Sequence, residues 1–136
     1  AFMGLAQKSI AVSLQSLHTL QASFLLEEGA EAVRIIRNDN WVNLNNGNNY
    51  YLEFYNNKWS LNTATVPAVD IFTRTVNVTS VYRDNTTYNI LANQCNPITT
   101  CTLDPDTRLI NITVSWSEKG LNKSKSVSFY LLNIFK

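Results

Sequence analysis

The feature that most constrains the fold of this chain is a run of helix-forming residues at its start. Between residues 2 and 37 there is no proline, glycine occurs only as Gly4 and Gly29, and leucine, alanine, glutamine and glutamate predominate. At about 1.5 Å per residue, such a run predicts one helix of about 50 Å, which is long for a small domain. We therefore expect a single helix over residues 1–38, stopped by Asn38-Asp39-Asn40, whose residues tolerate a left-handed conformation.

After Trp41 the apolar period changes from 3.6 to 2, which indicates strands. The Asn56-Asn57 pair tolerates positive φ angles and can close a tight hairpin. The alternation predicts strands at residues 50–55, 58–61, 71–83, 110–117 and 125–135. Inward-facing side chains are expected at Phe72, Val76, Val78, Tyr82, Ile110, Ile112, Val114, Trp116, Val127, Phe129 and Leu131.

These patterns predict one α+β domain over residues 1–136, in which the long helix packs against an antiparallel sheet of about four to five strands. The sheet region is expected over residues 46–136. Residues 84–108 show no clear period, so they predict a loop, and its length makes it a candidate functional loop.

The charge composition gives no electrostatic indication of the partner. The net charge is +1 and only 15% of the residues are charged, without a basic stripe or an acidic tail. Nucleic acid is therefore not an expected partner.

The chain contains two cysteines, Cys95 and Cys101, separated by turn-forming residues. A disulfide is the favoured interpretation, with two free thiols as the alternative. The disulfide would indicate an oxidising compartment. We expect no metal site and no cofactor, because His18 is the only histidine and no further thiolates complete a ligand shell.

Apolar residues on the helix exceed what one buried face requires. One stripe runs through Ile10, Leu14, Leu17, Leu20 and Phe24, and we expect it to continue through Leu26, Val33 and Ile36. The stripe fits either a wide contact with the sheet or packing of the N-terminal half on other subunits. The residues proposed to pack on other subunits are Phe2, Leu5, Ile10, Leu14 and Leu17.

The end of the helix carries a charge cluster made of Glu27, Glu28, Glu31, Arg34 and Arg37. Glu31 precedes Arg34 at the spacing of helix-surface ion pairs. Arginines in the last turns complement the negative end of the helix dipole. The cluster is therefore expected to be structural, and neither it nor His18 predicts an enzyme.

The segment ASFLLEEGAEAVRIIRNDNW, residues 22–41, resembles the end of the long helix in PilV-like minor pilins of the type IV pilus and in type II secretion pseudopilins. The matching pieces are Ala22–Leu25, Glu28–Glu31, Val33–Arg37, Asn40–Trp41, Phe72–Arg74, Val81–Asp84 and Ile112–Trp116. The apolar half-helix with which that family begins does not occur here. The resemblance therefore implies that Ala1 lies within the mature helix and that the chain would contact a membrane only through the absent N-terminal segment.

The resemblance implies a structural minor pilin that takes part in pilus assembly and in adhesion or motility. Its partners would be other pilin subunits, the assembly machinery and a host or neighbouring cell surface. Its location would be an extracellular pilus, anchored in the inner membrane before assembly. The alternatives are a pseudopilin of a secretion or DNA-uptake machine, or an adhesin-like module at the filament tip, with Tyr51 and Tyr55 as candidate surface-binding residues.

Overall fold

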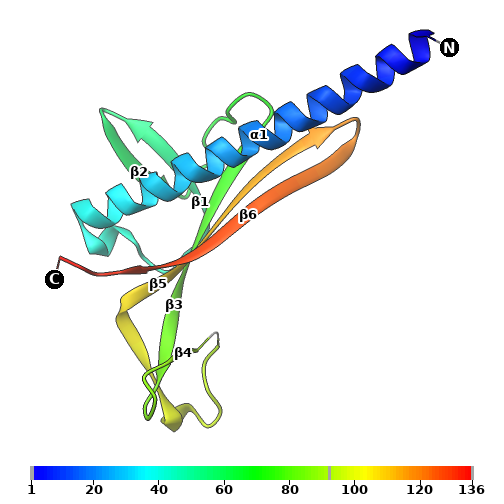
Figure 1. Ribbon diagram of the computed structural model, residues 1–136. Helices are drawn as coiled ribbons and strands as arrows, with labels where there is room; N and C mark the ends of the chain where they lie inside the picture. The colour runs from blue at the N-terminus through cyan, green and yellow to red at the C-terminus, as the bar shows by residue number, and fades with distance from the viewer. Residues whose placement is uncertain (1, 92, 136) are drawn as a thin grey trace.

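The computed structural model describes the backbone of residues 2–91 and 93–135 and the side chains of residues 13–91 and 93–135. One helix, α1 (Phe2–Asp39), lies across an antiparallel sheet, so the chain has the expected α+β fold (Figure 1). The six strands are β1 (Gly47–Tyr55), β2 (Lys58–Asn62), β3 (Thr73–Asp84), β4 (Ile90–Leu91), β5 (Cys101–Glu118) and β6 (Leu121–Leu132). The expected count of four to five strands was too low, because the two-residue β4 is too short to show alternation.

The strand order is β2-β1-β3-β5-β6, and β4 pairs with β3. β1 pairs with β3 only as far as Val78, and β4 then pairs with Tyr82 and Arg83. The pair formed by β3 and β5 therefore runs on past the helix, and β4 and the 3₁₀ turn Ile98–Thr100 lie at its far end (Figure 1). We call this part, residues 81–107, the distal end.

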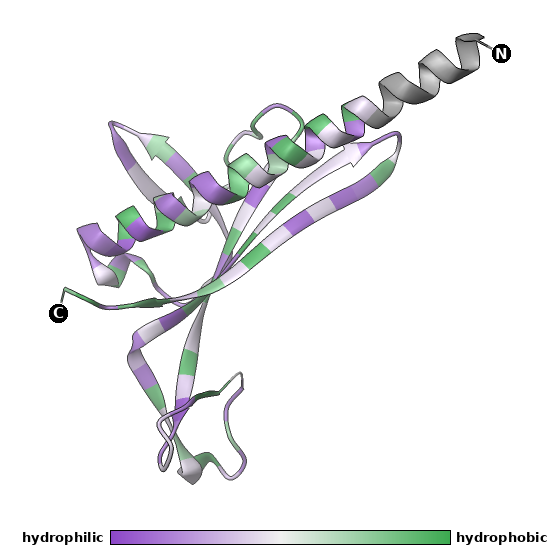
Figure 2. Ribbon diagram, in the orientation of Figure 1, coloured by the Kyte–Doolittle hydropathy of each residue, from purple (hydrophilic) through white to green (hydrophobic). Residues whose placement is uncertain are grey.

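The hydrophobic core lies between α1 and the middle of the sheet. Ile110, Ile112 and Val114 on β5 are completely buried, and Trp116 is 7% exposed, which confirms the expected alternation of this strand. Green segments alternate with white and purple ones along β3 and β5 in Figure 2, as expected for a sheet with one dry and one wet face.

A register shift in the β3–β5 pair corrects the expected inward face of β3. Ser80 pairs with Arg108 but Val81 pairs with Asp104, so three extra residues of β5 bulge between them. A bulge changes which side chains face the core. Beside the bulge Val81 is buried at 3% exposure, outside the main core cluster, while Tyr82, expected inside, is only half-buried.

The expected loop over residues 84–108 was wrong in part, because the bulged strand β5 occupies its second half. β5 already begins at Cys101, and the segment before it contains β4 and a 3₁₀ turn. Pro105 and Asp106 interrupt the apolar alternation here, so the sequence pattern did not indicate a strand. At the edge of the sheet, β6 begins at Leu121, earlier than the expected residue 125. Val127, expected to face inward, is 37% exposed because this edge strand is incompletely covered.

The two expected turns had different outcomes. Asn56 and Asn57 have φ angles of 52° and 58°, which confirms the tight hairpin between β1 and β2. The expected left-handed stop of the helix was wrong. Asn40 is extended at φ −162°, and its side chain accepts a hydrogen bond from the Val42 amide, starting the 3₁₀ turn Trp41–Asn43.

Candidate functional site

The α1 helix has apolar side chains on two opposite faces. The face toward the sheet buries Ala22, Leu26, Val33 and Ile36. A second row stays exposed, and we call it the apolar stripe: Leu14 (45% exposed), Leu17 (48%), Leu20 (53%) and Phe24 (60%). None of the side chains that the structure describes covers this stripe enough to exclude water from it.

The geometry of a helix explains why the expected continuous stripe was wrong. Successive residues are rotated by about 100°, so Phe24 and Leu26 point in directions about 200° apart. Leu26, Val33 and Ile36 therefore pack on the sheet, whereas Leu17 and Phe24 face solvent. Leu14 and Leu17 are thus exposed, as subunit packing requires, while the side chains of Phe2, Leu5 and Ile10 lie outside the described residues.

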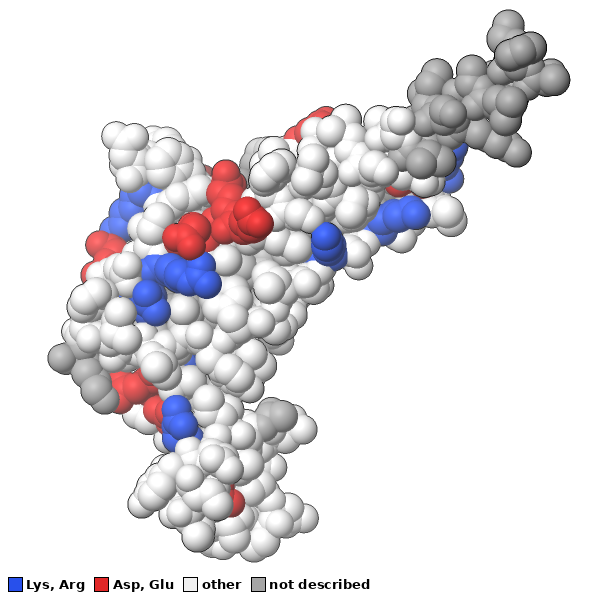
Figure 3. Space-filling view, in the orientation of Figure 1, with Lys and Arg blue, Asp and Glu red and all other residues white. Residues whose placement is uncertain are grey.

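The charge cluster of the helix makes structural contacts. Arg34 forms the expected helix-surface pair with Glu31 at 2.7 Å and also lies 5.1 Å above the ring of Phe129 on β6. Arg37 donates a hydrogen bond to Asn38. Acidic and basic side chains lie side by side over the C-terminal half of α1 in Figure 3, and Glu27 is exposed there.

Glu28 has a partner that the sequence did not indicate. Arg74 on β3 places Nη1 2.8 Å from the Glu28 carboxylate and 2.9 Å from the Leu25 carbonyl oxygen. Its guanidinium lies 5.6 Å above the Trp59 ring, and its side chain is only 9% exposed. A Cβ atom on Gly29 would approach the Arg74 side chain to 3.3 Å, so the glycine permits this close contact between helix and sheet.

A second contact ties α1 to the end of β5. His18 Nδ1 lies 3.0 Å from Glu118 Oε1, and both side chains are largely buried, at 16% and 6% exposure. Nearby, Lys125 of β6 donates a hydrogen bond to Ser23 at 2.7 Å. His18 therefore has a structural partner, and no serine or cysteine nucleophile takes part in the contact.

The distal end is held by a disulfide and by side-chain hydrogen bonds. Cys95 and Cys101 are bonded, as expected. Arg83 Nε donates to Asp104 Oδ2 at 2.6 Å, and the buried Thr107 hydroxyl donates to the same oxygen at 2.7 Å. The bulge is thus fixed by a charged pair that crosses from β3 to β5.

Two carboxylates of the distal end have perturbed acidities. Partial burial raises the pKa of Asp104, but hydrogen bonds from Arg83, Thr107 and the Asp106 amide outweigh it, and the net shift is downward. Hydrogen bonds from the backbone amides of Thr87 and Thr86 lower the pKa of the half-buried Asp84. Both carboxylates stay ionised in these contacts, which fits structural acceptors.

The two candidate surface-binding tyrosines differ in exposure. Tyr55, at the end of β1, is 71% exposed, whereas Tyr51 is half-buried. Tyr51 pairs with Thr75, whose strand neighbour Val76 is buried under the helix, so both face away from α1. The structure thus places Tyr51 on the opposite side of the sheet from the apolar stripe.

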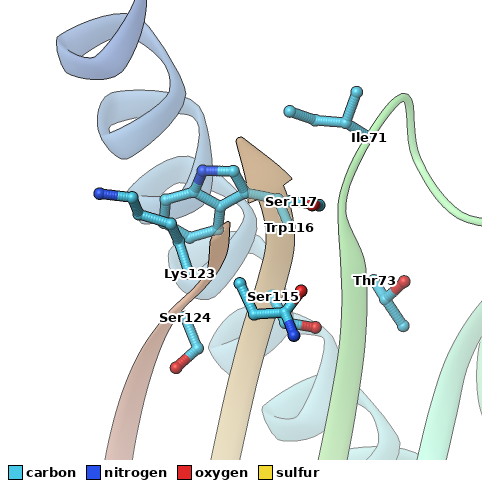
Figure 4. Close-up of a pocket in the computed structure, with 8 residues that line it drawn as sticks. Ile71, Thr73, Ser115, Trp116, Ser117, Lys123 and Ser124 are labelled. Atoms are coloured by element: carbon cyan, nitrogen blue, oxygen red, sulfur yellow. The ribbon is translucent and has the colours of Figure 1, made fainter. Parts of the chain in front are cut away.

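The side of the sheet turned away from α1 carries an array of hydroxyl and amide side chains, which we call the hydroxyl face. Cross-strand pairing aligns them in rows over β3, β5 and β6: Thr73–Ser115–Ser124, Thr75–Thr113–Ser126, Asn77–Asn111–Ser128 and, on two strands, Ser117–Asn122. Thr73, Ser115 and Ser124 border an open hollow of about 530 Å³ at one end of the array (Figure 4). The alternation of residues 111–117 predicted that one side of β5 faces solvent. The extension of the array over β3 and β6 depends on strand pairing.

Among the described residues, no three His, Cys, Asp or Glu side chains group as metal ligands. No described helix is long and apolar enough to cross a membrane.

Comparison with known proteins gives no relative from which a role could be transferred. No protein-family model, no curated protein and no solved structure matches this chain.

Proposed function

We propose that this protein is a structural, non-enzymatic subunit of a type IV pilus, a minor pilin whose helix packs against the helices of neighbouring subunits. The observation that carries the proposal is the apolar stripe of α1, which lies opposite the face that packs on the sheet. Burying a leucine or phenylalanine side chain contributes about 1.5 to 3 kcal/mol, so covering the stripe would favour assembly substantially.

Two further features support this role. A single 38-residue helix across one antiparallel sheet agrees with the α+β arrangement that the resemblance implies. The Cys95–Cys101 disulfide fits an oxidising, extracellular environment. In this arrangement the helix would face the filament centre, and the distal end would face outward.

The proposal can be tested in the source organism. After deletion of the gene, complementation with the wild-type chain should return it to filaments sheared from the cell surface, as detected with an antibody against the chain. The double variant Leu17→Glu/Phe24→Glu should be produced but lost from filaments, because charged groups cannot be buried between helices without a partner.

A matched control places the same charge elsewhere. Ile98 is 62% exposed at the distal end, so Ile98→Glu should fold and enter filaments normally. Since all three positions are exposed, each variant should unfold within about 0.5 kcal/mol of the wild type. Absence of the wild-type chain from sheared filaments, or normal incorporation of the double variant, would contradict the proposal.

The same deletion strain separates the alternatives. A pseudopilin would leave surface filaments unchanged while protein secretion or DNA uptake fails. An adhesin-like tip subunit would give intact filaments but lost attachment when residues 85–100 are replaced by a short linker. The exposed Tyr55 favours neither alternative by itself.

A further inference from the structure

The strand order places β2 at one edge of the sheet and β6 at the other (Figure 1). β2 has five residues, whereas β6 has 12. β6 pairs with β5 along its whole length without a register shift, and it contains no proline. Natural sheets usually shorten, bend or cover a free edge, because its unpaired backbone groups can pair with another chain. β6 is therefore the strand of this sheet best suited to accept a further strand.

The turn before β6 decides which of its backbone groups point at β5. Lys119 and Gly120 have φ angles of 50° and 76°, which fits a two-residue hairpin turn. In such a turn the amide of Leu121 bonds to the carbonyl oxygen of Glu118, its partner in the register. From there the groups directed at β5 belong to every second residue. At the other end the Asn133 amide donates to a carbonyl oxygen of β5 at 2.9 Å, which continues the same alternation.

The intervening residues of β6 direct their backbone groups away from β5. They are Asn122, Ser124, Ser126, Ser128 and Tyr130, and all of them are exposed. Within the part of the chain that the structure describes, these backbone groups bond to no other group. Their side chains lie on the face turned away from α1 and are short, apart from the tyrosine. An approaching strand would therefore meet accessible donors and acceptors at the spacing of a sheet ladder.

Lysine is the charged residue type along this edge. Lys119 lies in the turn, Lys123 and Lys125 lie on the helix side of β6, and no aspartate or glutamate follows Glu118 in the sequence. Basic groups follow one another along this margin of the molecule in Figure 3. A second strand beside β6 would therefore lie next to positive charge.

The helix side of β6 has room for the side chains of a further strand. An open hollow of about 490 Å³ between α1 and the start of β6 includes Ser23 and Lys123. Lys125 donates a hydrogen bond to Ser23, and an ammonium group has two further donors. Glu118 also borders the hollow, but its side chain is 6% exposed and lies 3.0 Å from His18. The exposed charges at this place are therefore the lysines.

Further along β6 the helix side becomes apolar. Val127 is 37% exposed, and Phe129 is half-buried with the guanidinium of Arg34 5.1 Å above its ring. An apolar side chain on an added strand would exclude water from Val127. Along the helix side, β6 thus presents two basic residues followed by two apolar ones.

We propose that β6 accepts an extended acidic segment of another protein as an antiparallel strand. On the helix side this segment carries apolar residues opposite Phe129 and Val127, followed by acidic residues opposite Lys125 and Lys123. From its N-terminus the pattern is apolar-x-apolar-x-acidic-x-acidic, where x is a small polar residue. Antiparallel pairing is slightly more stable per residue than parallel pairing.

Charge complementarity selects this occupant over a second copy of the chain. Inward-facing lysines on an edge strand usually discourage pairing, because their ammonium groups would lose water without gaining a partner. A second β6 would bring further lysines and no carboxylate. An acidic strand supplies the missing partners, so the same lysines that reject other strands favour this one.

The test measures the binding of fluorescein-labelled peptides to the 136-residue chain by fluorescence anisotropy. The acidic peptide is Thr-Val-Thr-Val-Thr-Glu-Thr-Glu-Thr, and the matched peptide has lysine in place of glutamate. The acidic peptide should bind at least about tenfold more tightly than the lysine peptide. Its affinity should fall when the salt concentration is raised to about 0.5 M, because salt screens exposed charges.

Hydrogen exchange followed by NMR locates the bound peptide. In the free chain the amides of Ser124, Ser126 and Ser128 should exchange rapidly, and the acidic peptide should slow them. The amides of Lys125 and Val127 already bond to β5 and should change little. This alternation distinguishes an added strand from a ligand that contacts only the lysine side chains.

Two variants at one position separate the backbone from the side chain. Ser126→Pro removes a free edge amide and should weaken binding at least about tenfold, while the fold is kept, because proline is tolerated where the amide of an edge strand faces solvent. Ser126→Ala keeps that amide and should bind like the wild type. Thermal unfolding establishes that each variant is folded.

A third variant tests the charges without altering the backbone. Lys123→Gln/Lys125→Gln should weaken binding of the acidic peptide about tenfold and abolish most of its salt dependence. This variant and the exchange pattern decide the question even where the proline variant fails to fold.

Four results would overturn the proposal. These are no binding of the acidic peptide, equal binding of the lysine peptide, unchanged exchange of the Ser124 and Ser126 amides in the complex, and self-association that protects the β6 amides in sedimentation and exchange experiments. The last result would assign the edge to a second copy. Peptide binding is measured on the isolated chain and filament entry at the cell surface, so the two proposals succeed or fail separately.

Discussion

Arg74 Nη1 on β3 lies 2.8 Å from Glu28 Oε1 on α1, which makes a largely buried arginine one of the polar links between the helix and the sheet. The same nitrogen donates to the Leu25 carbonyl oxygen. The helix is thereby held in one rotational setting, with Val33 and Ile36 inside and the apolar stripe outside. The position of the proposed assembly surface therefore depends on this contact.

Replacing Arg74 by methionine should lower the free energy of unfolding by about 2 to 3 kcal/mol, because a charged hydrogen-bonding group is lost from a buried site. Chemical denaturation measures the change. The matched control, Arg37→Met, removes an arginine that donates only to its neighbour Asn38 and should cost less than about 1 kcal/mol. Equal losses in the two variants would show that Arg74 is not a specific link.

Reducing the Cys95–Cys101 disulfide should destabilise the distal end. In the chain-entropy model, a loop this short contributes about 2 kcal/mol. Hydrogen exchange should accelerate first in β4 and around Cys101, while Ile110 and Ile112 in the core stay protected. A Cys95→Ser/Cys101→Ser variant should resemble the reduced protein and show no further response to reductant.

Acid should weaken the distal end through Asp104. Its folded pKa lies below the ordinary value of 3.8, so its contribution to stability is present above that pH and is lost as the pH falls through the folded pKa. At pH 7, Asp104→Asn should unfold about 1 to 2 kcal/mol more easily, because Arg83 loses its ionised acceptor. The difference should shrink steadily below about pH 4, and a constant difference down to pH 2 would contradict this assignment.

The hairpin between β1 and β2 should depend on the residue type at position 57. Asn57 has φ 58°, so Asn57→Ala should cost about 1 kcal/mol, and Asn57→Gly should be neutral or stabilising. Asn48→Ala, which changes an exposed asparagine on β1, should fall within about 0.5 kcal/mol of the wild type. Thermal unfolding distinguishes the three variants.

Local sequence patterns predicted much of the fold. The absence of proline and the abundance of helix formers indicated α1, the apolar alternation of residues 110–117 indicated the inner face of β5, and the Asn56-Asn57 pair indicated the hairpin. The Cys95–Cys101 bridge was expected from its short spacing and lone pair of cysteines. Each of these features depends on neighbours within a few residues, because helix period, strand pleat and turn conformation are local properties of the backbone.

The tertiary structure alone decided which apolar face of α1 is buried, since Leu26 and Phe24 are equally apolar in the sequence and only the position of the sheet separates them. It also decided the Arg74–Glu28 contact, which joins residues 46 positions apart, and the burial of Val81 beside the bulge. The hydroxyl face arises in the same way, because its rows are formed by strand registers that bring together residues from three separate segments. Such relationships are set by packing and pairing between distant segments, and a single sequence carries no local signal for them.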